Sequence, residues 1–126
     1  MPPHKPLIFD EFEGLARLQF PNFLDIEHLN VGQVEIVEIN NGIITPTKTY
    51  TGAVAGTVPP TNQIHTINSG AEGSILILRC QEAAIVDNTG NLRLRSNFTM
   101  NNSNDTLVLL KIRNGNWLEL ARSNND

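Results

Sequence analysis

The stretch Ser74-Ile75-Leu76-Ile77-Leu78-Arg79 decides the fold class, together with the later stretch Asp105-Thr106-Leu107-Val108-Leu109-Leu110. Each contains four consecutive aliphatic residues, a run that is short for a helix and is bounded by polar turn residues. Continuous apolar runs of this length are typical of strands that are covered on both faces. In a small antiparallel domain the second cover often comes from a neighbouring subunit. We therefore expect these two strands to lie at the centre of an assembly.

Shorter strand candidates surround the two runs. They lie at residues 64–67, 83–87, 91–95, 98–100 and 117–121, and the gaps between strands hold Gly and Asn turn residues such as Ser69-Gly70, Asn88-Thr89-Gly90 and Asn114-Gly115. Many short strands at this spacing are typical of a sandwich or barrel. The fold class predicted is all-β: a small antiparallel β-sandwich or barrel of short strands.

The segment that precedes this region predicts a hairpin and a linker. Val34–Ile39 has the composition of a strand, and Asn41-Gly42 is a strong signal for a tight turn. Residues 43–50 are then the expected partner strand, which Pro46 makes an edge or an interrupted strand. Residues 51–61 read as a linker. We expect one β-domain at 34–126, with the hairpin and linker at 34–63 and the regular core at 64–126.

Residues 1–33 follow a different pattern. Three prolines at the start oppose both ladder and helix, and only residues 10–19 have the spacing of one short helix. Four of the five Phe residues lie here, and they either close one end of the core or anchor an arm on another subunit. We expect an N-terminal attachment arm at 1–33, extended in form. Its capsid or subunit contacts would be Phe9, Phe12, Phe20 and Phe23.

Charge and composition exclude several classes of protein. The net charge is −4, with three basic and seven acidic residues in 1–63 and six of each in 64–126. Such a chain lacks the positive footprint of a nucleic-acid-binding protein. No apolar run approaches the roughly 20 residues of a membrane span, and no signal-peptide pattern is present. We expect neither nucleic acid nor membrane as a partner.

Motifs for catalysis, cofactors and metals are missing from the sequence. The only group with ligand chemistry at short spacing is Asp25, Glu27 and His28, for which a solvated loop is the favoured interpretation. Cys80 has no second cysteine to pair with and reads as a small buried apolar residue. There is no phosphate-binding loop and no nucleophile elbow. We expect no enzyme activity, no cofactor and no metal.

Trp117, the only Trp, is expected to make a subunit contact. It lies two residues after the Asn114-Gly115 turn. In an alternating strand Trp117 and Glu119 share one face, while Leu118 and Leu120 share the other. We expect the two Leu residues to point into the core. Trp117 would then be covered by the N-terminal arm or by a neighbouring subunit.

The order of motifs from Asn41 onward carries a resemblance. Thr66-Ile67-Asn68-Ser69-Gly70-Ala71-Glu72-Gly73 leads into the first apolar run, and Gly90-Asn91-Leu92-Arg93-Leu94, Asp105-Thr106-Leu107 and Asn114-Gly115-Asn116-Trp117-Leu118-Glu119 follow. This order resembles a small β-domain that recurs in bacteriophage virion proteins: tail fibres, head fibres and capsid decoration (cement) proteins. The resemblance covers roughly two thirds of the chain.

The resemblance implies a structural role in the virion and, commonly, a homotrimer. We therefore expect a capsid decoration protein that binds the major capsid protein, lies on the capsid surface of the virion and is made in the host cytoplasm. The alternative is a short head or tail fibre, or a receptor-binding tip, whose partner is a host-surface glycan or a tail component.

Overall fold

The computed structural model describes residues 8–9, 18–19 and 27–125. The chain divides into two units, Met1–Asn30 and Val31–Asp126. In the first unit, β1 (Ile8–Phe9) pairs antiparallel with β2 (Leu18–Gln19).

The helix predicted over 10–19 is wrong at its C-terminal end, because Leu18 and Gln19 form a strand. They pair with β1 instead. The rest of that predicted helix lies outside the described residues. Among the predicted contact residues, Phe9 lies in β1, and Phe12, Phe20 and Phe23 lie outside the described residues.

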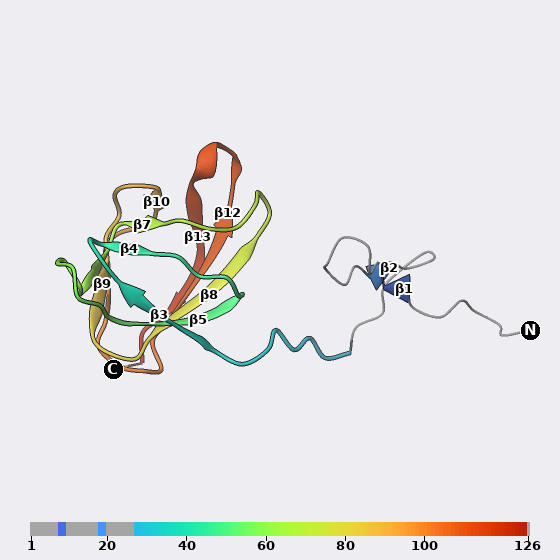
Figure 1. Cartoon of the computed structure of the whole chain (residues 1–126), viewed down its shortest axis with the longest axis horizontal. Coiled ribbons are helices and arrows are strands. Elements are labelled where there is room, and N and C mark those ends of the chain that lie inside the picture. The colour runs from blue at the N-terminus through green and yellow to red at the C-terminus, as the bar shows by residue number, and fades with distance from the viewer. Residues whose placement is uncertain (1–7, 10–17, 20–26, 126) are drawn as a thin grey trace, which may run out of the picture. The chain divides into compact units, whose positions relative to one another are not determined.

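The second unit confirms the all-β prediction, because its described elements are strands and one short 3-10 turn (Figure 1). The strands are β3 (Glu35–Ile39), β4 (Ile43–Ile44), β5 (Tyr50–Ala55), β6 (Gln63–Ile64), β7 (Thr66–Ile67), β8 (Ile75–Cys80), β9 (Ala84–Val86), β10 (Leu92–Arg93), β11 (Phe98–Met100), β12 (Thr106–Lys111) and β13 (Trp117–Ser123). The turn η1 (Arg113–Gly115) joins the last two strands.

Three sheets enclose one core. The largest has six strands in the order β10-β13-β12-β8-β5-β3, the second has the order β11-β9-β6, and the third pairs β4 with β7. Figure 1 shows these strands curling around a common interior. The buried apolar side chains that fill it are Ile39, Ile44, Ala53, Ile64, Ile67, Leu76, Leu78, Cys80, Ala84, Val86, Leu92, Leu94, Phe98, Met100, Leu107, Leu109 and Trp117.

More of the strand pairs are parallel than the turn signals predict. Five of the nine strand pairs in the described residues are parallel, among them β3 with β5 and β5 with β8. A strand that feeds a parallel neighbour needs a crossover, and the segments between β3, β5 and β8 supply it. The sheet is therefore mixed, not purely antiparallel.

The predicted hairpin of residues 34–50 is reduced to its turn. Asn41 and Gly42 both have positive φ, 54° and 72°, and Asn40 and Ile43 exchange two backbone hydrogen bonds across them. Beyond this bridge the strands separate, and β4 pairs with β7. The side-chain oxygen of Asn40 accepts from the backbone N–H groups of Thr57 and Val58, which ties the end of β3 to a different segment.

The predicted facing of β13 is also wrong. Trp117 is 2% exposed and packs into the core of its own domain, whereas Leu118 and Leu120 are 40% and 47% exposed. The indole N–H of Trp117 donates to the carbonyl of Ile67 at 3.3 Å. The Trp117 face can be buried because the carboxylate of Glu119, on the same face, is paired with Arg122.

Candidate assembly surface

The outer face of the six-stranded sheet carries apolar side chains in place of the usual polar ones. On β8, the inward residues Leu76 and Leu78 are buried, while Ile75 is 38% exposed and Ile77 half-buried on the opposite face. On β12, Leu107 and Leu109 are buried and Val108 and Leu110 alternate outward. The two long apolar runs therefore supply both the core and an uncovered face, since alternate residues of a strand point to opposite sides.

Strand register aligns these outward residues into two rows. The first row runs from Leu118 to Leu110 to Ile75 across β13, β12 and β8. The second runs from Ala121 to Val108, Ile77 and Tyr50, and so continues onto β5. We call the outer apolar face the set Ile36, Tyr50, Ile75, Ile77, Val108, Leu110, Leu118 and Leu120, which spans β3, β5, β8, β12 and β13.

A bulge in β13 shapes the end of this face. The pairing shifts between Leu109 with Glu119 and Val108 with Ala121, so β13 holds one extra residue there. An extra residue reverses the alternation that follows it. Leu120 stays exposed in the bulge, and Arg122 turns to the inner side, where its guanidinium lies 4.8 Å from the centre of the Phe98 ring.

An ion pair holds this inner side together. Arg122 donates to both carboxylate oxygens of Glu119, at 2.7 and 2.8 Å, and the backbone N–H of Arg95 adds a third bond at 3.0 Å. The Glu119 side chain is 3% exposed. The hydrogen bonds from Arg122 hold the pKa of Glu119 below its ordinary value, and the same pairing raises the pKa of Arg122. This group stabilises the domain and is not reached from the outer face.

Two charged residues stand on the outer side of these strands. Arg79 ends the outward series of β8, and Glu38 lies outward and exposed on β3. Nη1 of Arg79 donates to the hydroxyl of Tyr50 at 3.3 Å, but its Nε is fully buried with no acceptor. No carboxylate within the described residues pairs with Arg79. Gly52, which pairs with Arg79 from β5, has no side chain and so supplies no carboxylate.

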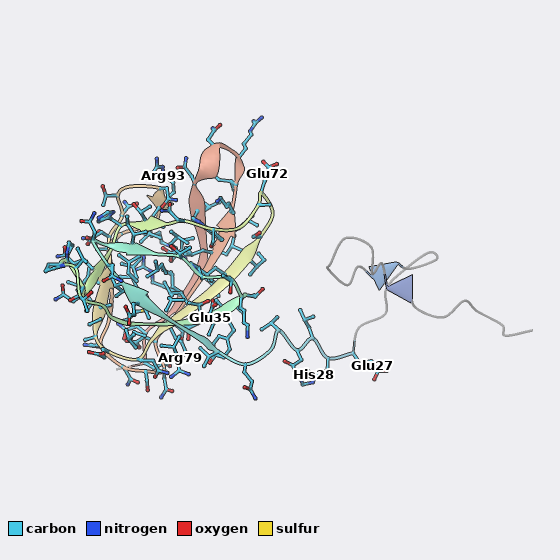
Figure 2. All side chains as sticks on the ribbon, in the orientation of Figure 1. Glu27, His28, Glu35, Glu72, Arg79 and Arg93 are labelled. Atoms are coloured by element: carbon cyan, nitrogen blue, oxygen red, sulfur yellow. The ribbon has the colours of Figure 1, made fainter. Side chains whose placement is uncertain are left out.

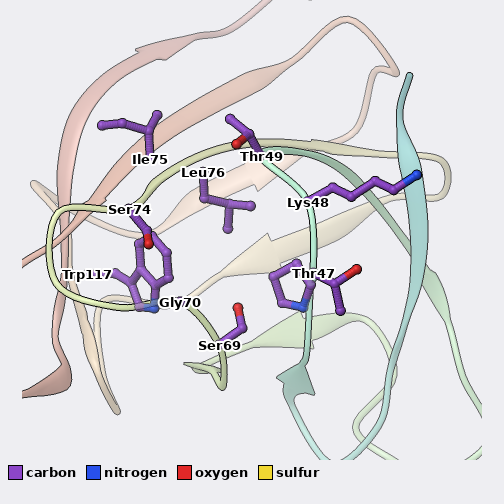
Figure 3. A pocket seen from close by; sticks show the side chains of 10 residues that line it. Thr47, Lys48, Thr49, Ser69, Gly70, Ser74, Ile75, Leu76 and Trp117 are labelled. Atoms are coloured by element: carbon purple, nitrogen blue, oxygen red, sulfur yellow. The ribbon is translucent and has the colours of Figure 1, made fainter. Parts of the chain in front are cut away.

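A hollow of about 300 Å³ with a mixed polar and apolar lining lies at the start of β8 (Figure 3). Its lining is rich in hydroxyls from Thr49, Ser69 and Ser74, with one side formed by the Trp117 ring. Figure 3 shows Lys48 running away from that ring. A Cβ on Gly70 would lie 3.3 Å from Trp117, so the glycine keeps this wall open. The hollow offers hydroxyl and backbone groups and suits a small neutral polar ligand better than an ion.

The described residues hold no cluster of three or more His, Cys, Asp or Glu side chains that is arranged to bind a metal. Glu27 and His28 are both exposed and are labelled in Figure 2, and Asp25 lies outside the described residues. Cys80 is buried, where its thiol donates to the carbonyl of Met100 at 3.5 Å, and burial raises its pKa. Glu27, His28 and Cys80 form no cluster of metal-binding side chains with other residues in the described part of the chain.

The sequence interpretation missed the residues of the candidate surface. Trp117, which was predicted to make a subunit contact, is covered by its own domain, and the large apolar residues of β13 that are exposed are Leu118 and Leu120. The signal that could have revealed the outer face was Arg79, because a charged residue two positions after Ile77 marks the outward side of β8.

Among the described residues, no helix has the length and apolar character needed to cross a membrane. Comparisons with protein family models, with characterised proteins and with solved structures gave no significant match.

Proposed function

We propose that this chain is a structural protein of a bacteriophage virion, most simply a capsid decoration protein, whose β-domain associates into a homotrimer through the outer apolar face. Its partner on the virion is the major capsid protein, and its place is the capsid surface. The role requires no catalysis and no cofactor. The observation that carries the proposal is the uncovered apolar face of the six-stranded sheet.

The outer apolar face has the character of an interface. Large contiguous apolar patches are rare on proteins that act alone, and they mark surfaces of association. Covering a whole Leu or Ile side chain contributes about 1.5–3 kcal/mol, so covering the exposed part of one contributes roughly 1 kcal/mol. Several such residues lie side by side here, on neighbouring strands of one rigid sheet.

The virion role rests on the sequence resemblance of residues 41–124 to the small β-domain of phage decoration and fibre proteins. That likeness also supports three copies in place of two. Part of the outer apolar face lies on β12 and β13, which carry the Thr106-Leu107 and Trp117-Leu118-Glu119 motifs of the resemblance.

The position on the virion is tested by copy number and by binding. A decoration protein should be present in hundreds of copies, on the scale of the capsid protein, when virions are measured by quantitative mass spectrometry. The purified chain should also sediment with empty heads assembled from the major capsid protein of the same phage. Copies in the tens, with no binding to heads, would contradict the decoration role and favour a fibre.

The second candidate is a short fibre or receptor-binding tip that contacts a host-surface glycan. The hydroxyl-lined hollow beside Trp117 favours it, because hydroxyl and backbone groups next to an aromatic ring suit a neutral sugar. Titration with galactose, glucose and N-acetylglucosamine, followed by the indole NMR signal of Trp117, tests this. Saturable shifts that are lost in Ser74→Val would support a sugar site, and unchanged spectra to high millimolar sugar would reject it.

A further inference from the structure

We propose that Arg79 of one copy pairs with Glu38 of the next, and that this pair fixes how the copies fit together. The inference rests on the proposed association through the outer apolar face. It adds the polar contact that gives that apolar surface a defined register.

Arg79 is prepared for an acceptor that its own chain does not supply. Its Nε is fully buried, so the donors open to a second copy are those of the two Nη groups, and their one hydrogen bond within the described residues goes to the uncharged hydroxyl of Tyr50. A guanidinium is always charged and presents five donors in a planar fork suited to a carboxylate. Because the residue borders the apolar rows, association would remove still more water from it, and an acceptor must then come from the partner.

Glu38 is the matching group on the same side of the sheet. It lies outward on β3 and is exposed, and its carboxylate has no hydrogen bond or ion pair with the residues that the structure describes. The other two carboxylates of this region are already engaged: Glu35 accepts from Thr47 and from the backbone N–H of Lys48, and Glu119 binds Arg122. Among the described residues of these strands, Glu38 is therefore the carboxylate that remains available to a second copy.

Within one chain Arg79 and Glu38 do not pair with each other. Arg79, Gly52 and Ile36 share a row across three strands, and Glu38 stands one outward position further along β3. Two strand spacings and one side-chain repeat separate their Cα atoms by roughly 12 Å. Each copy thus presents the Arg79 guanidinium and the Glu38 carboxylate at two different places on the same side of the sheet.

A closed ring satisfies both charges at once. When the copies are related by rotation, the same contact repeats at every interface, and each Arg79 meets the Glu38 of its neighbour. No charge is then left unpaired. A copy that docked in a shifted register would instead place Arg79 against Leu or Val, so the pair selects one arrangement.

Charge reversal in the full chain tests the pairing. Arg79→Glu and Glu38→Arg should each weaken association at least about tenfold, as close interfacial charge pairs typically do. The double variant Arg79→Glu with Glu38→Arg should restore it to near the wild-type level. Native mass spectrometry and sedimentation at matched micromolar concentrations measure both, and circular dichroism verifies that each variant is folded.

Two controls sharpen the test. Glu72 lies beyond the opposite end of β8 from Arg79 (Figure 2), and Arg113 is exposed in the η1 turn, so Glu72→Arg with Arg113→Glu should leave association unchanged. Mixing Arg79→Glu with Glu38→Arg distinguishes a twofold dimer from a ring of three. A dimer with one copy of each variant would have opposite charges at both 79–38 contacts, so its association should be restored. A ring of three copies keeps at least one 79–38 contact between like charges, so its association should stay weakened.

The outcomes separate this inference from the function on which it rests. A folded Arg79→Glu chain that associates as the wild type does, or a double variant no better than the single ones, would overturn the pairing while leaving association intact. A wild-type chain that is monomeric at all concentrations tested would overturn both.

Discussion

Trp117 is a core residue of its own domain and not the exposed residue that the alternation of β13 predicted. It is almost fully buried, and its indole N–H bonds the carbonyl of Ile67, while the ammonium of Lys111 lies 5.6 Å from the ring centre. Replacing a buried Trp by Ala typically costs about 3–5 kcal/mol. We expect Trp117→Ala to lower the free energy of unfolding by about this amount, measured by denaturant titration. Trp117→Phe should lose much less, and equal losses would contradict the packing described.

Gly90 is a residue whose missing side chain makes room for the backbone of His65, between β6 and β7. Its φ is +59°, and a Cβ there would lie 1.9 Å from the carbonyl oxygen of His65. Gly115 also has a positive φ, +74°, but nothing lies near its Cβ position. Gly115→Ala should therefore cost only the backbone term, roughly 1–2 kcal/mol. Gly90→Ala should cost clearly more in thermal unfolding, because the backbone of residue 65 must move. Equal losses of thermal stability in Gly90→Ala and Gly115→Ala would contradict this, because residue 65 would then move aside at little cost.

Glu119 gives the domain a defined response to acid. The bonds from Arg122 hold its folded pKa below the ordinary value near 4.5. The stabilisation is therefore complete above that ordinary value and is lost as the pH falls toward the folded pKa. We expect Glu119→Gln to lower stability at pH 7 by about 1.5–3 kcal/mol, as for hydrogen bonds to charged groups. It should also flatten the fall in stability as the pH drops below the ordinary pKa of Glu119, whereas the exposed control Glu82→Gln should not.

At the scale of elements, Asp105 organises the loop before β12 and the end of the chain. Its carboxylate, which is buried, accepts from the backbone N–H groups of Asn101 and Asn102 and from that of Asn125 at 2.6 Å. Asp105→Ala leaves these donors without an acceptor, which costs about 1–3 kcal/mol. Hydrogen exchange should show lost protection at Asn125, with Asp105→Asn affected less. Unchanged exchange in Asp105→Ala would contradict this anchoring.

Most strands were predictable from the sequence, but their partners were not. The predicted linker over residues 51–61 is wrong at its start, because Thr51–Ala55 belong to β5, an interior strand of the six-stranded sheet. β8, β12 and the β12–β13 turn lie where the apolar runs and Asn114-Gly115 place them, because these signals are local. The parallel pairing of β5 with β8 joins segments about 25 residues apart and leaves no local signature. The facing of β13 depended on a bulge and on the partner of Glu119, and neither is visible in an alternation pattern.

At the scale of the whole molecule, the outer apolar face could not be assigned from sequence for a related reason. A continuous run such as Ile75–Leu78 has equally apolar residues on both sides, so it predicts coverage without saying which side is the core. The structure separates the two sets: Leu76 and Leu78 fill the interior, and Ile75 and Ile77 face outward beside Val108 and Leu110. The central claim is that copies of this chain meet on that outward set.

Sedimentation equilibrium of a single substitution on that face tests the claim most directly. Leu118 is 40% exposed at the β13 end of the row that continues to Leu110 and Ile75. Val58 is 52% exposed on a loop outside the sheet, which makes Val58→Asp a matched control for Leu118→Asp. The account predicts a wild-type and a Val58→Asp species of 41.7 kDa, three times 13.9 kDa, and a folded Leu118→Asp monomer of 13.9 kDa. A monomeric wild type, or a Leu118→Asp variant that remains trimeric, would contradict it.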